Sequence, residues 1–156
     1  MEGHNKTHFK TDSVHRVLAH SYSMYFLLFL IGLSLDSVNK FKIFNNPSMI
    51  SMGILFLIVG TFLIFWAQKT SRHLRKENIS KETFLHGPYR FTRTPTNFGL
   101  FFLMVGFGLI TNAAFVILFA FISFIIAKLA FLRKEEQILA NKYGAPYLEY
   151  KKSVKF

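Results

Sequence analysis

The stretch that decides the fold is TPTNFGLFFLMVGFGLITNAAFVILFAFISFIIA, residues 94–127, in which no side chain carries a formal charge. One helix over this whole stretch would be about 50 Å long, whereas the hydrocarbon core of a bilayer is about 30 Å thick. Thr111-Asn112 is the only turn-like break inside it. The sequence therefore predicts a tight hairpin of two membrane spans, residues 96–110 and 113–132.

Two further uncharged segments precede the hairpin, residues 17–35 and 49–67. Each is close to the roughly 20 residues that cross a bilayer. A cleavable signal peptide is the alternative for the first segment, because Gly32 and Ser34 resemble the small residues of a cleavage site. The polar leader and the later spans argue against it. We expect an all-α integral membrane protein with about four transmembrane helices, and Gly53 and Gly60 predict close helix packing on one face of the second span.

The charged residues are clustered between these apolar segments. The chain has 19 Lys and Arg against 8 Asp and Glu, and its mean hydropathy is +0.31. With four spans, 16 of the 19 basic residues lie on the side of both termini, and Lys40 and Lys42 lie on the other. The positive-inside rule then places both termini in the cytoplasm. We expect a lipid bilayer and no nucleic acid as partner, in the plasma membrane of a microbe rather than the endoplasmic reticulum.

We expect a single membrane domain over residues 1–156. A polar leader, residues 1–16, enters the first span through a short interfacial helix; two spans fill residues 17–67, and a cytoplasmic loop covers 68–95. The hairpin and its tail fill residues 96–156. The last helix continues into the cytosol to about residue 143, since Gly144 and Pro146 supply a stop, and residues 147–152 fold back. Asp36 is expected to be solvated, and Lys128 to extend to the membrane surface.

Two polar clusters flank the hairpin on the same side of the membrane, residues 86–95 and 135–150. Because neighbouring antiparallel helices bring their ends together, the arginines of the first cluster should oppose the Glu135-Glu136 pair of the second. Such a pocket suits a zwitterionic or anionic ligand that also carries a hydroxylated ring. The alternative is an ordinary membrane surface of basic residues, anchoring tyrosines and a solvated helix face.

Two X-Pro pairs shape the first cluster, Gly87-Pro88 and Thr94-Pro95. Proline disfavours the helical conformation in the residue before it. We therefore expect a fixed, non-helical loop over residues 86–95, with its N–H groups and the N-terminus of the next helix available to a ligand.

These residues also resemble a known family. Residues 87–99, GPYRFTRTPTNFG, are similar to the pattern G-P-Y-R-x-x-R-H-P-x-Y-x-G, and residues 135–150 are similar to E-E-x-x-L-x-x-x-[FY]-G-x-x-Y-x-x-Y. Together these are marks of the isoprenylcysteine carboxyl methyltransferases, which are related to the phospholipid N-methyltransferases. The resemblance covers about residues 50–154. Thr94 and Asn97 stand where the family pattern has His and Tyr.

The resemblance implies methyl transfer from S-adenosylmethionine to a lipophilic acceptor that enters laterally from the bilayer. The acceptor is a prenylated or isoprenoid carboxylate, or else a lipid amine. Arg90 and Arg93 are the implied catalytic residues, and a hydroxyl, a water or His86 would replace the family's His. The implied cofactor-binding residues are His86, Tyr89, Arg93, Pro95, Gly99, Glu135, Glu136, Tyr143 and Tyr147, with Tyr150 also closing the pocket.

Other functions stay open. The sulfonium leaving group of S-adenosylmethionine is already activated, so we expect no metal. The chain has no cysteine, which excludes thiolate metal sites and a cysteine nucleophile. A membrane sterol or lipid reductase that uses NADPH has similar terminal helices, and a non-catalytic membrane protein that retains the fold is the third reading. The oligomeric state is left open.

Overall fold

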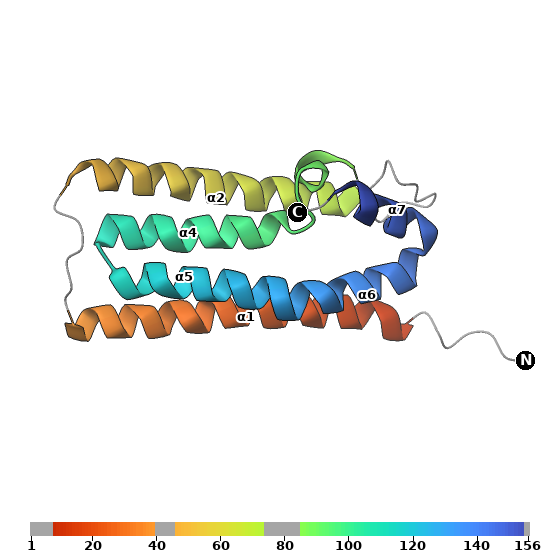
Figure 1. The fold of residues 1–156 in the computed structure, drawn as a ribbon, viewed down its shortest axis with the longest axis horizontal. Helices are drawn as coiled ribbons and strands as arrows, with labels where there is room; N and C mark the ends of the chain where they lie inside the picture. The colour runs from red at the N-terminus through yellow and green to blue at the C-terminus, as the bar shows by residue number, and fades with distance from the viewer. Residues whose placement is uncertain (1–7, 40–45, 74–84, 155–156) are drawn as a thin grey trace, which may run out of the picture.

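The computed structural model describes residues 8–39, 46–73 and 85–154, and every regular element in these ranges is helical. Figure 1 shows long rods lying side by side. α1 (His8–Asn39) and α2 (Ser48–His73) are followed by the hairpin of α4 (Pro95–Thr111) and α5 (Ala114–Ile126). The predicted all-α fold is confirmed. Lys40, Lys42, residues 1–7 and residues 74–84 lie outside the described residues, so the predicted orientation stays a prediction.

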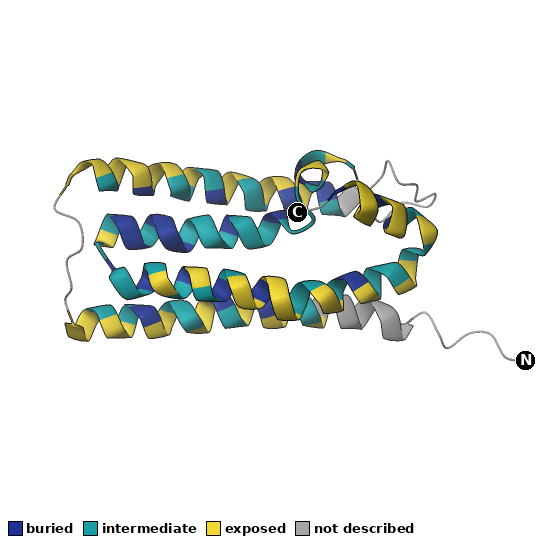
Figure 2. Cartoon of the chain, viewed as in Figure 1, coloured by how far each residue is buried: buried dark blue, intermediate teal, exposed yellow. Residues whose placement is uncertain are grey.

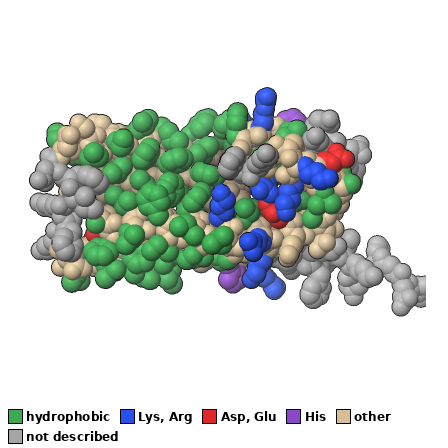
Figure 3. Space-filling view, viewed as in Figure 1, with side chains coloured by type: hydrophobic (Ala, Val, Ile, Leu, Met, Phe, Trp, Pro, Cys, Tyr) green, Lys and Arg blue, Asp and Glu red, His purple; other side chains and the backbone are tan. Residues whose placement is uncertain are grey.

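Three helical stretches are long and apolar enough to cross a membrane, Arg16–Asn39, Ser48–Ser71 and Ala114–Tyr143. The fourth apolar helix, α4, has 17 residues, which is the lower end of the length that spans a bilayer. Figure 3 shows apolar side chains over most of the face in view, with Lys and Arg side chains gathered toward one end. The chain is therefore built as a multi-pass membrane protein.

The hairpin turns at the predicted break. Asn112 adopts a left-handed conformation with φ of 55°, which Asn tolerates better than most residues, and the Ala113 N–H donates to the Gly108 carbonyl at 2.8 Å. Buried residues concentrate on α4, which packs between α2 and α5 (Figure 2). α4 is thus the central helix of the bundle.

The last rod is helical as far as Tyr143, as predicted. α5 continues through a π-helical turn (Ala127–Phe131) into α6 (Leu132–Tyr143), and the Leu132 N–H donates five residues back to Ala127. No feature of the sequence predicted this π turn, on which Lys128 is exposed. Gly144 then turns the chain with φ of 65°, and α7 (Ala145–Ser153) folds back. At the other end of the chain, α1 is one continuous helix, so the interfacial helix and the first span are a single element.

Glycines set the distance between α2 and α4. A Cβ added at Gly60 would lie 2.7 Å from the Gly99 carbonyl oxygen, and one at Gly106 would lie 2.7 Å from the Gly53 carbonyl oxygen. The two pairs are seven residues apart on both helices, so they recur on one face of each. Close packing at Gly53 and Gly60 is therefore confirmed. Small residues allow such backbone contact in membranes, where the hydrophobic effect does not drive helices together.

Asp36 is not simply solvated, contrary to the sequence-based expectation. Its carboxylate oxygens accept the N–H groups of Phe115 at 3.1 Å and Val116 at 3.0 Å, in the first turn of α5. α5 has no capping side chain of its own, so a residue from α1 supplies the cap. A carboxylate also interacts favourably with the positive end of a helix. The expectation failed because the capped residue Phe115 lies 79 residues further along the chain. A contact at that separation leaves no local pattern in the sequence.

Adding a side chain at the α2–α4 contact is expected to destabilise the bundle. Gly60→Val would push the helices apart, lowering stability by about 1–3 kcal/mol, as overpacking typically does. Thermal unfolding in detergent checks this, with Thr61→Val as the matched control because position 61 is exposed on the same helix. Equal midpoints for the two variants would contradict the contact.

Removing the cap supplied by α1 should weaken the first turn of α5, at the turn end of the hairpin. Asp36→Ala leaves two α5 N–H groups without their acceptor, at a cost of about 1 kcal/mol, whereas Asp36→Asn keeps an acceptor oxygen and should lose less. Hydrogen exchange at the Phe115 and Val116 amides measures the effect. Unchanged exchange in the alanine variant would show that Asp36 does not act as the cap.

Candidate functional site

The two polar clusters meet at one end of the bundle, as predicted. The Arg93 guanidinium, in the loop before α4, contacts the Glu136 carboxylate of α6. Lys151 of α7 contacts the other carboxylate oxygen of Glu136 at 2.7 Å. One carboxylate therefore ties together the loop, α6 and the terminal helix α7.

Glu136 is a buried acid that two cations neutralise. It is 8% exposed, and the Arg93 side chain is 15% exposed. A buried charge is tolerated when it is paired and hydrogen-bonded. Glu136 accordingly holds Arg93 in place, and it does not line the pocket described below.

The loop before α4 differs from the prediction in one respect. Gly87–Arg90 form a 3-10 turn, η1, although a non-helical loop was expected. Pro88 explains the difference, since its fixed φ and missing N–H suit the first turn of a helix, and its carbonyl accepts the N–H of Phe91 at 3.1 Å. Gly87 has φ of 60° and lies against Thr70 and Trp66 of α2, where no side chain would fit.

A polar pocket of about 110 Å³ lies beside this turn. Of the residues predicted to bind the cofactor, Tyr89, Arg93, Pro95 and Glu135 line it. The positions at which the chain departs from the family pattern, Thr94 and Asn97, line it as well. The departures therefore change the chemistry of the pocket wall itself.

The other predicted residues lie outside this pocket wall. His86 precedes η1 and is exposed, and Arg90 is also exposed. Thr94, at the position of the family's His, lines the pocket, and His86 does not. Gly99 packs against Gly60 of α2.

The tyrosines of the C-terminal tail pack against Tyr89 of the pocket wall. Tyr147 and Tyr150 are 3% and 2% exposed and form a cluster with Val154, against which Tyr89 and Tyr143 pack. The Tyr150 hydroxyl donates to the Tyr89 carbonyl at 2.8 Å. These contacts hold Tyr89 at the pocket wall, and burial raises the pKa of the Tyr89 hydroxyl above its ordinary value.

Several pocket residues come from α1 and α2, outside the predicted site. They are Leu18, Tyr22, Ala67, Gln68 and Ser71. The hydrophobic pattern of the first two spans places them near the ends that adjoin the polar clusters, but it does not show which face of each helix meets the loop. Tyr22 is also within side-chain hydrogen-bonding contact of Thr96, at the start of α4.

The two acids of the pair have different surroundings. Glu135 lies beyond the 20 or so residues of the last rod that fill a bilayer core. Burial, and secondly the negative charge of Glu136, raise the pKa of Glu135 to about 7. Glu135 is therefore a carboxyl group on the pocket wall that changes its charge near neutral pH.

A family model for phospholipid methyltransferases matches residues 49–146. The match covers well over half of the chain, including the first polar cluster and the Glu135-Glu136 pair of the second, so the chain belongs to the phospholipid methyltransferase family. This group of integral-membrane methyltransferases is related to the isoprenylcysteine enzymes that the motifs resemble, and the predicted kinship is confirmed. Family membership identifies the chain as a membrane methyltransferase. No curated protein and no solved structure matches it.

Loss of the central carboxylate is expected to release α7. Glu136→Ala leaves Arg93 and Lys151 without this partner, and removing one member of a buried ion pair costs about 3–5 kcal/mol. Trypsin should then cleave at Lys142 and Lys151 roughly tenfold faster than in the unmodified chain. Glu149→Ala is the matched control, because Glu149 is an exposed acid on α7 itself; equal rates for both variants would refute the role of Glu136.

Proposed function

We propose that the chain binds S-adenosylmethionine in the polar pocket and transfers its methyl group to the head-group amine of a membrane phospholipid. The observation that carries the proposal is that Arg93 and Glu135, opposite in charge and from different elements, line one pocket. The methionyl part of the cofactor carries a carboxylate and an ammonium, which these two side chains match. The pocket volume of about 110 Å³ suits this part of the cofactor alone.

Each pocket residue has a distinct task in this proposal. The Arg93 guanidinium carries five N–H donors, so it can contact Glu136 and a ligand carboxylate together. Glu135 accepts hydrogen bonds from the ligand ammonium, and the wall formed by Tyr89 and Pro95 excludes water. When bound, the cofactor supplies a methyl group activated by its sulfonium. The chain then contributes alignment of the acceptor and desolvation of its nucleophile.

The charge of the pocket favours an amine over a carboxylate as the acceptor. Arg93 is already paired with Glu136, and ionised Glu135 adds negative charge to the wall. A carboxylate acceptor would be repelled by Glu135, whereas a neutral amine would not. The family's description as phospholipid methyltransferases supports the same choice. An isoprenoid carboxylate remains the second candidate, because Arg90 and Arg93 lie in the adjoining loop.

The proposal also fixes the orientation of the molecule. Figure 3 shows the Lys and Arg side chains near the end of the molecule that carries α7. The positive-inside rule places this end in the cytosol, and the cofactor is a polar, water-soluble molecule that would enter from there. Both termini would then be cytoplasmic, and the acceptor would arrive from the bilayer.

A cofactor-binding experiment separates the three functional classes. The purified full chain in detergent is titrated with S-adenosylmethionine and, separately, with NADPH. Binding of the first alone, with transfer of a labelled methyl group to an amine in a phospholipid extract, supports the proposal. Binding of NADPH alone would favour a reductase, and binding of neither would favour a non-catalytic protein. Methylation of an isoprenoid carboxylate in place of the amine would show that the acceptor is the carboxylate.

The affinity for S-adenosylmethionine is expected to rise with pH. Glu135 has a pKa of about 7, so it is mostly neutral at pH 5.5 and half ionised at pH 7, and only the ionised form attracts an ammonium. Binding should strengthen about tenfold over this interval. Isothermal titration calorimetry measures it.

Glu135→Gln should lose this pH dependence and bind weakly throughout, whereas Glu149→Gln, at an exposed acid, should keep it. A variant at position 135 that retains the full pH dependence would remove Glu135 from the binding site.

A further inference from the structure

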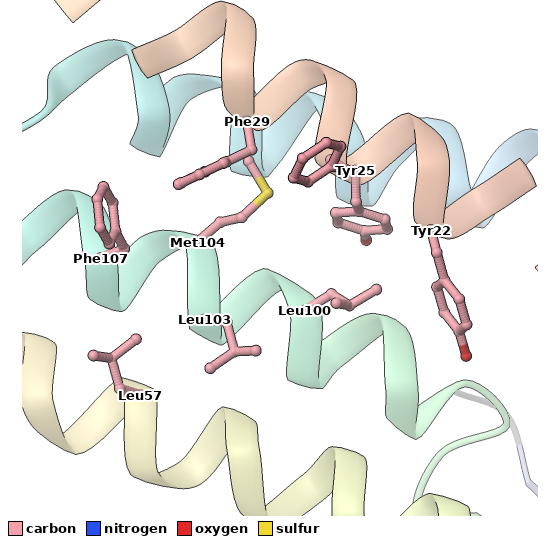
Figure 4. Close-up of a pocket in the computed structure, with 9 residues that line it drawn as sticks. Tyr22, Tyr25, Phe29, Leu57, Leu100, Leu103, Met104 and Phe107 are labelled. Atoms are coloured by element: carbon pink, nitrogen blue, oxygen red, sulfur yellow. The ribbon is translucent and has the colours of Figure 1, made fainter. Parts of the chain in front are cut away.

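Tyr22 of α1 lines two cavities that adjoin each other. One is the polar pocket, and the other is an open groove of about 320 Å³ between α1, α2 and α4, with mainly aromatic and aliphatic walls. Figure 4 shows Tyr22 at the end of this groove nearest the start of α4, with its ring directed toward that helix. The residue is 39% exposed, so a molecule in either cavity can reach it.

The family match does not account for Tyr22. The match begins at residue 49, so all of α1 lies outside it, and both family motifs lie in the second half of the chain. The packing of α1 along α5 and α6 nevertheless brings Tyr22 to the pocket wall that Tyr89, Thr96 and Glu135 also form. The role of this residue therefore has to be derived from the geometry of the pocket.

The Tyr22 hydroxyl has one protein partner and the capacity for another. It is within hydrogen-bonding contact of the Thr96 side chain, in the first turn of α4. A phenolic hydroxyl has one O–H donor and two acceptor lone pairs, so the contact with Thr96 leaves a lone pair for a ligand N–H. The Glu135 carboxylate is close enough to interact electrostatically with Tyr22. An amine at this point would thus meet two acceptor groups.

The place of the reaction follows from the proposed function, on which this inference rests. When Arg93 and Glu135 hold the carboxylate and ammonium of S-adenosylmethionine, the pocket of about 110 Å³ is filled, and the sulfonium lies at its edge. The acceptor arrives on the apolar side, which meets the pocket at Tyr22. The acceptor nitrogen and the methyl carbon therefore meet beside the Tyr22 hydroxyl.

We propose that Tyr22 orients the acceptor amine and limits the number of methyl groups that the amine receives. A neutral amine attacks through one lone pair, and in-line displacement requires this pair to point at the methyl carbon. An N–H donated to the Tyr22 hydroxyl fixes its direction. The nitrogen then forms the N–C bond, the C–S bond breaks with its electron pair going to sulfur, and the product ammonium releases an N–H proton to solvent water.

Each methylation removes one N–H group from the acceptor. A primary amine and a monomethylamine can both donate to Tyr22, whereas a dimethylamine has no N–H left. Its methyl groups would also lie against a hydroxyl whose hydrogen bond they cannot satisfy, which carries a free-energy cost. The first two methyl groups are therefore expected to transfer readily, and the third slowly.

Methyl transfer to three separate acceptors tests the proposal. The full chain is placed in vesicles that contain phosphatidylethanolamine, its N-methyl form or its N,N-dimethyl form, and mass spectrometry follows the head groups after S-adenosylmethionine is added. We expect kcat/KM for the dimethyl acceptor to be about tenfold below that for the monomethyl acceptor. Because both values come from one preparation, their ratio does not depend on the fraction of folded protein.

Variants at the hydroxyl sharpen the result. Tyr22→Phe should lower kcat for the primary amine about tenfold with little change in KM, because alignment is lost, and should raise the dimethyl-to-monomethyl ratio about fivefold. Tyr25→Phe is the matched control, since Tyr25 is a buried tyrosine of the same helix that does not line the polar pocket, and its ratio should stay unchanged. If Thr96 acts through Tyr22, Thr96→Val added to Tyr22→Phe should change the ratio no further.

Three outcomes would overturn this role of Tyr22 while leaving the proposed function intact, because methyl transfer occurs in each. They are equal kcat/KM values for the monomethyl and dimethyl acceptors in the unmodified chain, an unchanged ratio in Tyr22→Phe, and an equal change of the ratio in Tyr25→Phe. Absence of transfer to all three acceptors would instead reject the proposed function, and the role of Tyr22 would fall with it.

Discussion

The backbone contact between α2 and α4 is the constraint on which the rest of this bundle depends. Paired glycines let the two helices approach until carbonyl oxygens of one lie against Cα atoms of the other, at Gly60 with Gly99 and again at Gly53 with Gly106. A bilayer gives helices little hydrophobic reason to associate, so shape complementarity carries this contact. It also brings the end of α2, with Gln68 and Ser71, beside the start of α4. The wall of the polar pocket therefore exists because two helices that are distant in sequence fit closely.

A second constraint acts at the polar end of the bundle, which carries the loop before α4 together with α6 and α7. Glu136 holds Arg93 on one side and Lys151 on the other, and the tail tyrosines cover the loop that carries Tyr89. The two acids of the doublet therefore divide the work. Glu136 forms ion pairs that hold the loop and α7, while Glu135 lies on the pocket wall with its pKa near neutrality.

The polar pocket adjoins an open apolar groove between α1, α2 and α4. Together the two cavities match the chemistry of a membrane methyltransferase. A polar cofactor and an apolar acceptor must meet although they come from different solvents. Tyr22 belongs to both cavities and contacts Thr96 at the start of α4. Tyr22 thus lies where the polar pocket and the apolar groove adjoin, beside the residues that the family motif supplies.

The sequence alone determined the helices, the hairpin turn at Asn112 and the meeting of Arg93 with the glutamate pair. These features depend on local composition, on turn chemistry and on the fact that an antiparallel hairpin brings its ends together. It also identified Tyr89, Arg93, Pro95 and Glu135, because they lie in a recognisable motif. Only the tertiary structure decided that Asp36 caps α5, that Lys151 completes the ion-pair network and that Tyr22 joins the pocket. Each of these depends on the rotation and depth of one helix against another, and uniformly apolar spans carry no periodic signal that fixes either.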